Sequence, residues 1–173
     1  DRGRNWKWRG RARPTGDNHF CEHSIVELAD HSLLKCLRTS AGLKESRSRN
    51  GGRTWTEPVH PIGLRQVVAR FGFIKLSNGH LLIVKNGPSA ERTNGDSREQ
   101  LSADVSDDEG RTWKGGLMLD GRKAVSYPDA IQLADGRIYV SYDHDRKTDS
   151  DEILLAGFME ADVMAGKLVD SKS

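Results

Sequence analysis

The chain has 173 residues, of which 35% are hydrophobic and 30% charged, and acids and bases nearly cancel at a formal charge of +2. This length fits one domain with a buried core, and the weak net charge gives no global field that would attract nucleic acid. No apolar run approaches the roughly 20 residues of a membrane-spanning helix, and no signal peptide is visible at the start. We therefore expect no membrane partner and disfavour a nucleic-acid partner.

The first 19 residues are predicted to form a basic arm or a lead-in strand. Six basic residues crowd the first 13 positions, interleaved with Trp6 and Trp8. Such a run can contact phosphates, but a loosely held terminal segment has the same composition. We favour the terminal segment, which places the folded part at residues 20–173.

Two cysteines follow, Cys21 and Cys36, without a CxxC pair or a histidine at metal-ligand spacing. Two reduced thiols are the default interpretation, and a disulfide stays open for an exported protein. We expect no metal and no cofactor.

A strand, turn, strand pattern occurs three times. The copies are residues 26–34, 74–83 and 131–140, with the turns Asp30-His31, Asn78-Gly79 and Asp135-Gly136. Asn-Gly and Asp-Gly between apolar strands predict two-residue hairpin turns. The units recur about every 50 residues, a period typical of β-propeller blades, because each small antiparallel sheet needs neighbours to bury its faces.

An octapeptide occurs twice, at residues 48–55 and 106–113, and both copies share Ser, Asn or Asp, Gly, Arg, Thr and Trp. The Asn50 or Asp108 side chain can bond to backbone N–H groups and hold a tight turn, while glycine supplies a positive φ. Trp55 and Trp113 are expected to be structural anchors.

Helix signals are scarce in this sequence. Residues 159–167 carry good helix formers and include Gly166 near the end, which predicts one or two helical turns. The stretch around residues 87–96 is predicted to be a long loop. The predicted fold class is all-β, with about three propeller blades of four-stranded antiparallel sheets.

The octapeptide Ser-x-Asp-x-Gly-x-Thr-Trp resembles the Asp box, or BNR repeat, of sialidases and related propellers. The second copy matches fully, and the first has Asn50 for the aspartate. In that family the box lies on the outer hairpin of a blade. It therefore indicates the fold and implies no catalytic role. Sialidase propellers have six blades, so about three blades would be half of one.

Residues 126–143 resemble the sialidase stretch that begins with the tyrosine nucleophile, although Pro128 replaces the usual serine. The resemblance implies that Tyr127 is the nucleophile and that Asp143 steadies an arginine of the site. It also implies that Glu27 is the carboxylate partner of the tyrosine. A neutral nucleophile suits sialic acid, because the carboxylate at its anomeric carbon would repel an anionic one.

Sialidases hold that carboxylate with three arginines, because a guanidinium can bind it with two hydrogen bonds. The resemblance implies that Arg98 is the third, with Arg92 as a rival, and that Arg38 is the second, several residues early. The first arginine and the acid–base aspartate have no counterpart. The four polar residues 143–146 can line a pocket or pair with one another on the surface. Residues 127–130, 142–146 and 152–154 are also similar to sialidase-like bacterial propellers.

Three functions follow from these observations. The resemblance implies an exo-acting glycoside hydrolase with a carbohydrate ligand, incomplete on its own. The alternatives are a non-catalytic glycan-binding fragment and a protein-assembly module. Open blade edges favour association, and two copies would restore a six-bladed ring with two-fold symmetry, so a homodimer is expected. Family members are often exported, and the sequence leaves localisation open.

Overall fold

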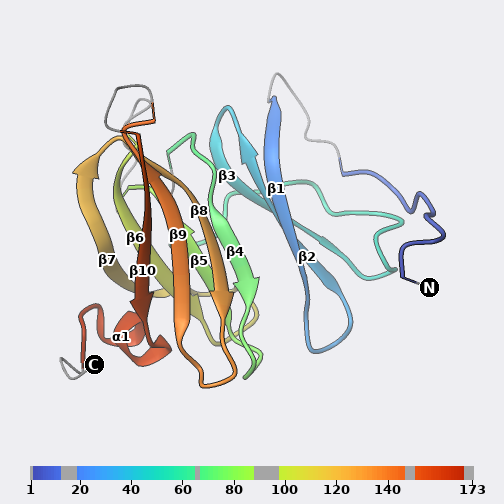
Figure 1. The fold of residues 1–173 in the computed structure, drawn as a ribbon. Helices are drawn as coiled ribbons and strands as arrows, with labels where there is room; N and C mark the ends of the chain where they lie inside the picture. Colours follow the sequence, from blue (N-terminus) through green and yellow to red (C-terminus); the bar gives the residue numbers. More distant parts are fainter. Residues whose placement is uncertain (1, 13–18, 65–66, 88–97, 147–150, 170–173) are drawn as a thin grey trace.

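The computed structural model describes residues 2–12, 19–64, 67–87, 98–146 and 151–169, and their strands form three antiparallel sheets (Figure 1). The first sheet has β1 (Phe20–Glu27), β2 (Leu33–Thr39) and β3 (Gly42–Ser48). The second has β4 (Gly72–Lys75), β5 (Leu81–Lys85), β6 (Glu99–Ser106) and β7 (Lys114–Lys123). The third has β8 (Val125–Gln132), β9 (Ile138–His144) and β10 (Glu152–Phe158).

The expected all-β class and blade architecture are confirmed, but only the second sheet has four strands among the described residues. In the first sheet the segment after β3 makes a single bridge, between Glu45 and Val59, instead of a fourth strand. In the third sheet β10 leads directly into α1 (Glu160–Ala165). That helix lies within the predicted span and ends at Gly166, whose φ is 65°. No described helix has the length and apolarity that a membrane crossing needs.

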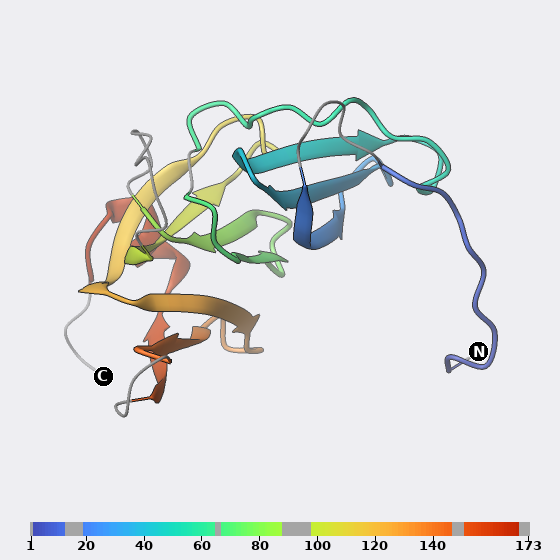
Figure 2. The ribbon, with the colours of Figure 1, turned by 90° about the horizontal axis from the view of Figure 1, so that it is seen from above.

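The first strands of the three sheets are neighbours, because β4 packs against both β1 and β8. Seen from above, the sheets fan out from these inner strands, as blades do (Figure 2). Strand β5 is buried on both faces and its side chains alternate between two cores. Leu81 and Ile83 join the core with the first sheet, whereas Leu82 and Val84 join the core with the third.

The three repeated turns share one geometry, which is a three-residue loop and not the expected two-residue turn. In each, the leucine before the loop (Leu28, Leu76 or Leu133) accepts a bond from the third loop residue and donates one to the residue after the loop, over 2.8–3.1 Å. The third loop residue has a positive φ: 63° at His31, 91° at Gly79 and 87° at Gly136. This is the three-residue hairpin that ends in a left-handed residue.

Both octapeptides fold as predicted. In the second, Asp108 accepts bonds from Ser106 Oγ at 2.8 Å and from the Thr112 backbone N–H at 2.8 Å. In the first, Asn50 accepts the equivalent bonds at 3.1 Å and 2.9 Å. Although burial raises the pKa of Asp108, the hydrogen bonds from Thr112 and Ser106 outweigh it and lower that pKa to about 2.

The second sheet buries one ion pair. Lys85 is 0% and Asp104 is 2% exposed, and Lys85 Nζ lies 3.2 Å from Asp104 Oδ2. Burial lowers the pKa of Lys85 and raises that of Asp104, and the attraction between the two charges opposes both shifts.

The two cysteines are both free, with Cys21 exposed and Cys36 buried. Burial raises the pKa of the Cys36 thiol. The loop predicted around residues 87–96 lies almost entirely outside the described residues.

Candidate functional site

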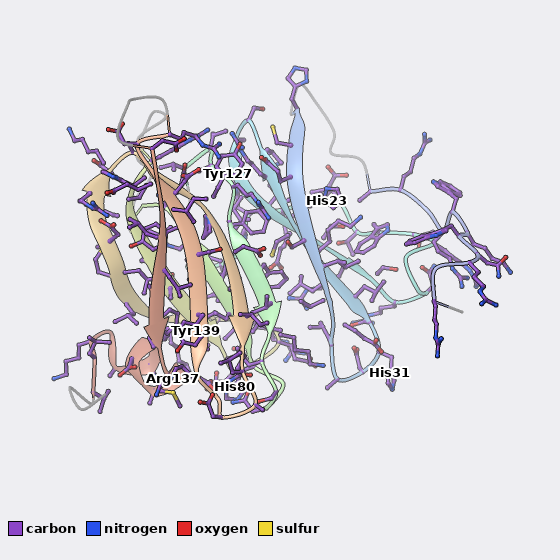
Figure 3. The ribbon with its side chains drawn as sticks, in the orientation of Figure 1. His23, His31, His80, Tyr127, Arg137 and Tyr139 are labelled. Carbon is purple, nitrogen blue, oxygen red and sulfur yellow. The ribbon has the colours of Figure 1, made fainter. Side chains whose placement is uncertain are left out.

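The three inner strands, or in one case the segment that leads into the strand, each place one polar residue at the same end of the sheets. Glu22, Arg70 and Tyr127 each precede the leucine of their repeated turn by six residues. Because the three residues lie at the same distance from their turns on neighbouring strands, all three lie at the end of the sheets opposite the turns. Figure 3 shows Tyr127 at this end, and His31, His80 and Arg137 at the end of the turns.

Glu22 and Arg38 form an ion pair between β1 and β2. Arg38 Nη1 donates to both carboxylate oxygens of Glu22, at 3.2 Å and 2.9 Å, and Arg38 Nη2 donates to the Val68 carbonyl at 3.3 Å. Burial raises the pKa of Glu22, but a backbone hydrogen bond, the Arg38 charge, and side-chain hydrogen bonds with Arg38 and Tyr127 together lower it. Glu22 is therefore a carboxylate at neutral pH, and it lies beside the tyrosine.

Tyr127 lies in an irregular part of β8. The register with β9 shifts between Ser126 and Asp129, which marks a bulge, and Tyr127 has a φ of 53°. Bulges re-aim side chains, and a positive φ in a bulky residue costs about 1–3 kcal/mol and is typical of functional sites. The β1–β2 register also shifts between Phe20 and His23, beside Glu22. Both residues thus lie where their strand departs from regular pairing.

Three arginines surround the Tyr127 ring. Their guanidinium carbons lie 4.0 Å (Arg146), 5.4 Å (Arg98) and 5.9 Å (Arg70) from its centroid. Asp143 holds the nearest of them, because its Oδ2 is 2.6 Å from Arg146 Nη2. The other oxygen of Asp143 accepts a bond from Ser126 Oγ at 2.6 Å. Asp143 is only 8% exposed, so this carboxylate is fixed.

The charges of this cluster do not cancel. Glu22 and Asp143 each pair with one arginine, Arg38 and Arg146. Arg70 and Arg98 have no carboxylate partner among the residues that the structure describes. Two surplus positive charges beside a tyrosine form a site for an anionic group, because guanidinium groups bind oxyanions with paired hydrogen bonds.

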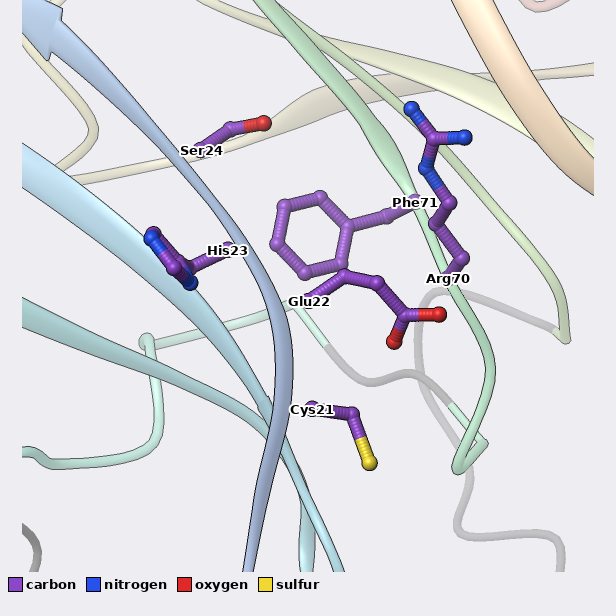
Figure 4. Close-up of a pocket in the computed structure, with 6 residues that line it drawn as sticks. All are labelled: Cys21, Glu22, His23, Ser24, Arg70 and Phe71. Carbon is purple, nitrogen blue, oxygen red and sulfur yellow. The ribbon is translucent and has the colours of Figure 1, made fainter.

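A pocket of about 550 Å³ adjoins the cluster. It is lined by Cys21, Glu22, His23, Ser24, Arg70 and Phe71. Figure 4 shows the Glu22 and Arg70 side chains beside Phe71, on the side of β1 away from the His23 ring. Among the described residues, no group of three or more His, Cys, Asp or Glu side chains could hold a metal.

The structure brings together four of the five residues proposed from the sequence: Tyr127, Arg38, Arg98 and Asp143. Glu27 is not among them. Its Oε1 lies 2.6 Å from His31 Nδ1 at the turn end of β1, and five residues of strand, or about 17 Å, separate it from Glu22. The rival Arg92 lies outside the described residues.

Three residues of the cluster were not assigned to the site from the sequence. They are Glu22, Arg70 and Arg146. The repeat register was a usable signal for the first two, because the position six residues before the turn leucine is occupied by Tyr127 in the third copy.

Blades that fan from inner strands, two Asp boxes, and a tyrosine among arginines at the end opposite the turns define a sialidase-like propeller fold. Residues 1–140 match the model of the BNR repeat-like domain family. The chain belongs to this family.

Relatives agree with that assignment. The chain is 28% identical over 158 residues to the anhydrosialidase of the leech Macrobdella decora, covering 83% of this chain and 20% of the relative. Among solved structures, the intramolecular trans-sialidase of Ruminococcus gnavus has a TM-score of 0.73 at 23% identity, covering 95% of this chain and 37% of that one.

An α-L-arabinofuranosidase of Fusarium graminearum has a TM-score of 0.59 at 16% identity, covering 83% of this chain and 47% of that one. The chain thus spans a fifth to a half of the length of these proteins. Because one of them is named for a different sugar from the others, the shared fold leaves the substrate undefined.

Proposed function

We propose that this chain carries the later blades of a sialidase-type exo-glycosidase site, and that its substrate is a terminal sugar with a carboxylate at the anomeric carbon. The observation that carries the proposal is the cluster of arginines around the Tyr127 ring, with the Glu22 carboxylate beside it. Arg98 and Arg38 would bind the sugar carboxylate together with Arg70, which like Arg98 has no carboxylate partner among the described residues. Asp143 would hold Arg146 in place.

In the proposed reaction, Tyr127 Oη forms a bond to the anomeric carbon while its proton passes to Glu22. The bond to the leaving oxygen breaks in the same step, and that oxygen takes up a proton from solvent water. Water then attacks the anomeric carbon and releases one proton to the solvent, and the tyrosine oxygen leaves and recovers its proton from Glu22. Both steps use Glu22 as the proton carrier, so its lowered pKa keeps it ready as a base at neutral pH.

An aryl sialoside with a fluorescent phenol as leaving group tests this proposal, because a good leaving group needs no general acid. We expect turnover by the wild-type chain, and at least a 100-fold loss in Tyr127→Phe and in Glu22→Gln. Glu27→Gln is the matched control on the same strand and should keep wild-type turnover. Loss in Glu27→Gln but not in Glu22→Gln would contradict the assignment of the base.

Glycan binding without turnover is the second candidate, and the surplus charge favours it equally. Titration of the ¹⁵N-labelled chain with free N-acetylneuraminic acid separates the two. Binding that requires Arg98 together with no turnover of the aryl sialoside would identify a binding module. Equal binding of arabinose and of N-acetylneuraminic acid would exclude the carboxylate as the recognised group.

A further inference from the structure

One side-chain amide joins the second and third sheets at the end opposite the turns. Asn86 directly follows β5 and is 0% exposed. Its Nδ2 donates to the Val125 carbonyl at 2.9 Å and to the Glu99 carbonyl at 3.3 Å. Because Glu99 begins β6 and Val125 begins β8, the amide ties together the first residues of two strands that belong to different sheets.

Backbone hydrogen bonds complete a closed ring of contacts around this amide. The Val125 N–H donates to the Arg98 carbonyl at 3.0 Å, and the Gly87 N–H donates to the Glu99 carbonyl, also at 3.0 Å. The carbonyl of Val125 accepts the bond from Asn86. Both backbone groups of Val125 are therefore bonded to residues at the end of β5 or just before β6.

Two side chains of the candidate site are attached to this ring. Arg98 directly precedes Glu99, and Tyr127 lies two residues after Val125. The guanidinium carbon of Arg98 is 5.4 Å from the centroid of the Tyr127 ring, although 29 residues separate the two in the chain. The Val125–Arg98 bond and the Asn86 amide thus link the two backbones close to the point where the side chains meet.

The contacts at this position require an amide. Two carbonyl oxygens face the side chain, and a carbonyl oxygen accepts hydrogen bonds but donates none. The NH₂ group of asparagine offers two donors, whereas serine offers one and a carboxylate offers none. Asn86 Oδ1 is buried with no hydrogen-bond partner among the described residues, and such burial is unfavourable. The two donated bonds are therefore the specific contribution of this amide.

The ring also holds strained backbone in place. Gln100, Ala124 and Tyr127 have positive φ values of 55°, 61° and 53°. Gln100 is next to Glu99, and Ala124 is next to Val125. Positive φ in residues other than glycine persists only where surrounding contacts enforce it. Loss of the Asn86 bonds should therefore let both segments relax.

We infer that Asn86 is a positioning residue, which fixes the backbones of Arg98 and Tyr127 relative to each other and so sets the distance between guanidinium and phenol. The side chain makes none of the contacts proposed for the sugar and acts through Val125 and Glu99. Its consequence for sugar binding rests on the proposed function, whereas its effect on the two side chains can be measured in the free protein.

Chemical shifts of the ¹⁵N-labelled chain test the positioning without a ligand. The ring current of a tyrosine shifts nearby protons, so Tyr127→Leu should move the Arg98 Nε–Hε signal. We expect this movement to be at least about twofold smaller in Asn86→Asp and in Asn86→Leu, because the two sites are coupled. Gln132→Glu is the matched control, since the Gln132 amide donates to the Gly136 carbonyl at the turn end. An undiminished movement in a folded Asn86 variant would overturn the inference.

Hydrogen exchange of the wild-type chain gives a result that needs no variant. Both Hδ2 protons of Asn86 are donated to buried carbonyls, so they should exchange with solvent at least about 100-fold more slowly than those of a free asparagine amide. Exchange at the free rate would refute the ring of contacts, even if every Asn86 variant failed to fold.

Sugar binding provides the functional measurement. Asn86→Asp and Asn86→Leu should raise the dissociation constant of N-acetylneuraminic acid at least about tenfold, and Gln132→Glu should not change it. With the aryl sialoside, KM should rise more than kcat falls, whereas simple loss of folded protein lowers kcat and leaves KM unchanged. An unchanged dissociation constant would contradict the inference. A wild-type chain that binds no sugar would refute the proposed function, and the shift and exchange measurements would still decide the role of Asn86.

Discussion

Arg146 lies over the ring of Tyr127, with its guanidinium carbon 4.0 Å from the ring centroid. The contact depends on Asp143, which is buried and forms an ion pair with the arginine. A planar guanidinium is well suited to stack on an aromatic face. The orientation of the proposed nucleophile therefore rests on a residue 16 positions away from it in the chain.

Asp143→Asn should release Arg146 from Tyr127 and weaken binding of N-acetylneuraminic acid by about tenfold, or about 1.4 kcal/mol. Arg146→Gln should have the same effect, and the double variant should lose no more than either single one, because both act through one contact. Arg137→Gln, at the turn end, is the control. Isothermal titration measures all four, and additive losses would contradict the shared contact.

The buried pair of Lys85 and Asp104 should be sensitive to loss of one partner. Asp104→Asn leaves Lys85 buried with no counter-charge and should lower the free energy of unfolding by about 3–5 kcal/mol. Replacing both, with Lys85→Met and Asp104→Leu, should recover most of that loss. Urea denaturation measures each variant.

An exposed pair provides the contrast. Lys114 Nζ lies 2.7 Å from Asp107 Oδ2, with side chains 48% and 32% exposed. Asp107→Asn should leave the free energy of unfolding almost unchanged, because water screens the charges. If Asp104→Asn and Asp107→Asn lowered the free energy of unfolding by similar amounts, burial of the ion pair would not explain the loss.

Asp108 should make the protein sensitive to acid. Its folded pKa of about 2 lies below the usual value, so its contribution to stability is present above about pH 4 and is lost as the pH falls through about 2. Asp108→Asn should remove about 1 kcal/mol of this pH dependence, after allowance for solvent screening. Asn50 serves the same turn in the first box, so the variant should still fold. Thermal melts of both proteins between pH 2 and 7 measure this pH dependence, and equal pH dependence in the two would contradict the prediction.

The turn at His31 should be improved by glycine. His31 has a φ of 63°, and a left-handed residue with a side chain costs about 1–2 kcal/mol. His31→Gly loses an exposed contact to Glu27, worth under about 1 kcal/mol, and should still stabilise the chain by about 0.5–1 kcal/mol. Gly79→Ala, at the equivalent turn position, should destabilise it by about 1 kcal/mol. Equal effects of the two changes would contradict the common turn geometry.

The positions of the turns, the boxes and the helix were predictable because local chemistry determines them, although each turn has three loop residues and not the expected two. Asn, Asp and Gly at fixed offsets specify the turns, and the strand repeat follows from burial on alternate faces.

The site was only partly predictable, because its residues meet through register and not through nearness in sequence. Glu27 was chosen for its place in a motif, yet it lies on the turn side of β1. Glu22 is the residue in register with Tyr127. Arg146 required the structure, because only the fold shows whether its partner Asp143 directs it into the site or along the surface.

The six-residue register of Glu22, Arg70 and Tyr127 has a consequence for how such chains change over generations. Each strand-turn-strand unit places one side chain at the end of the sheets opposite the turns. Glu22, Arg70 and Tyr127 occupy this position in the three repeats of the chain. Chemistry can therefore diversify by substitution at one position per blade, while the leucines of the turns preserve the scaffold.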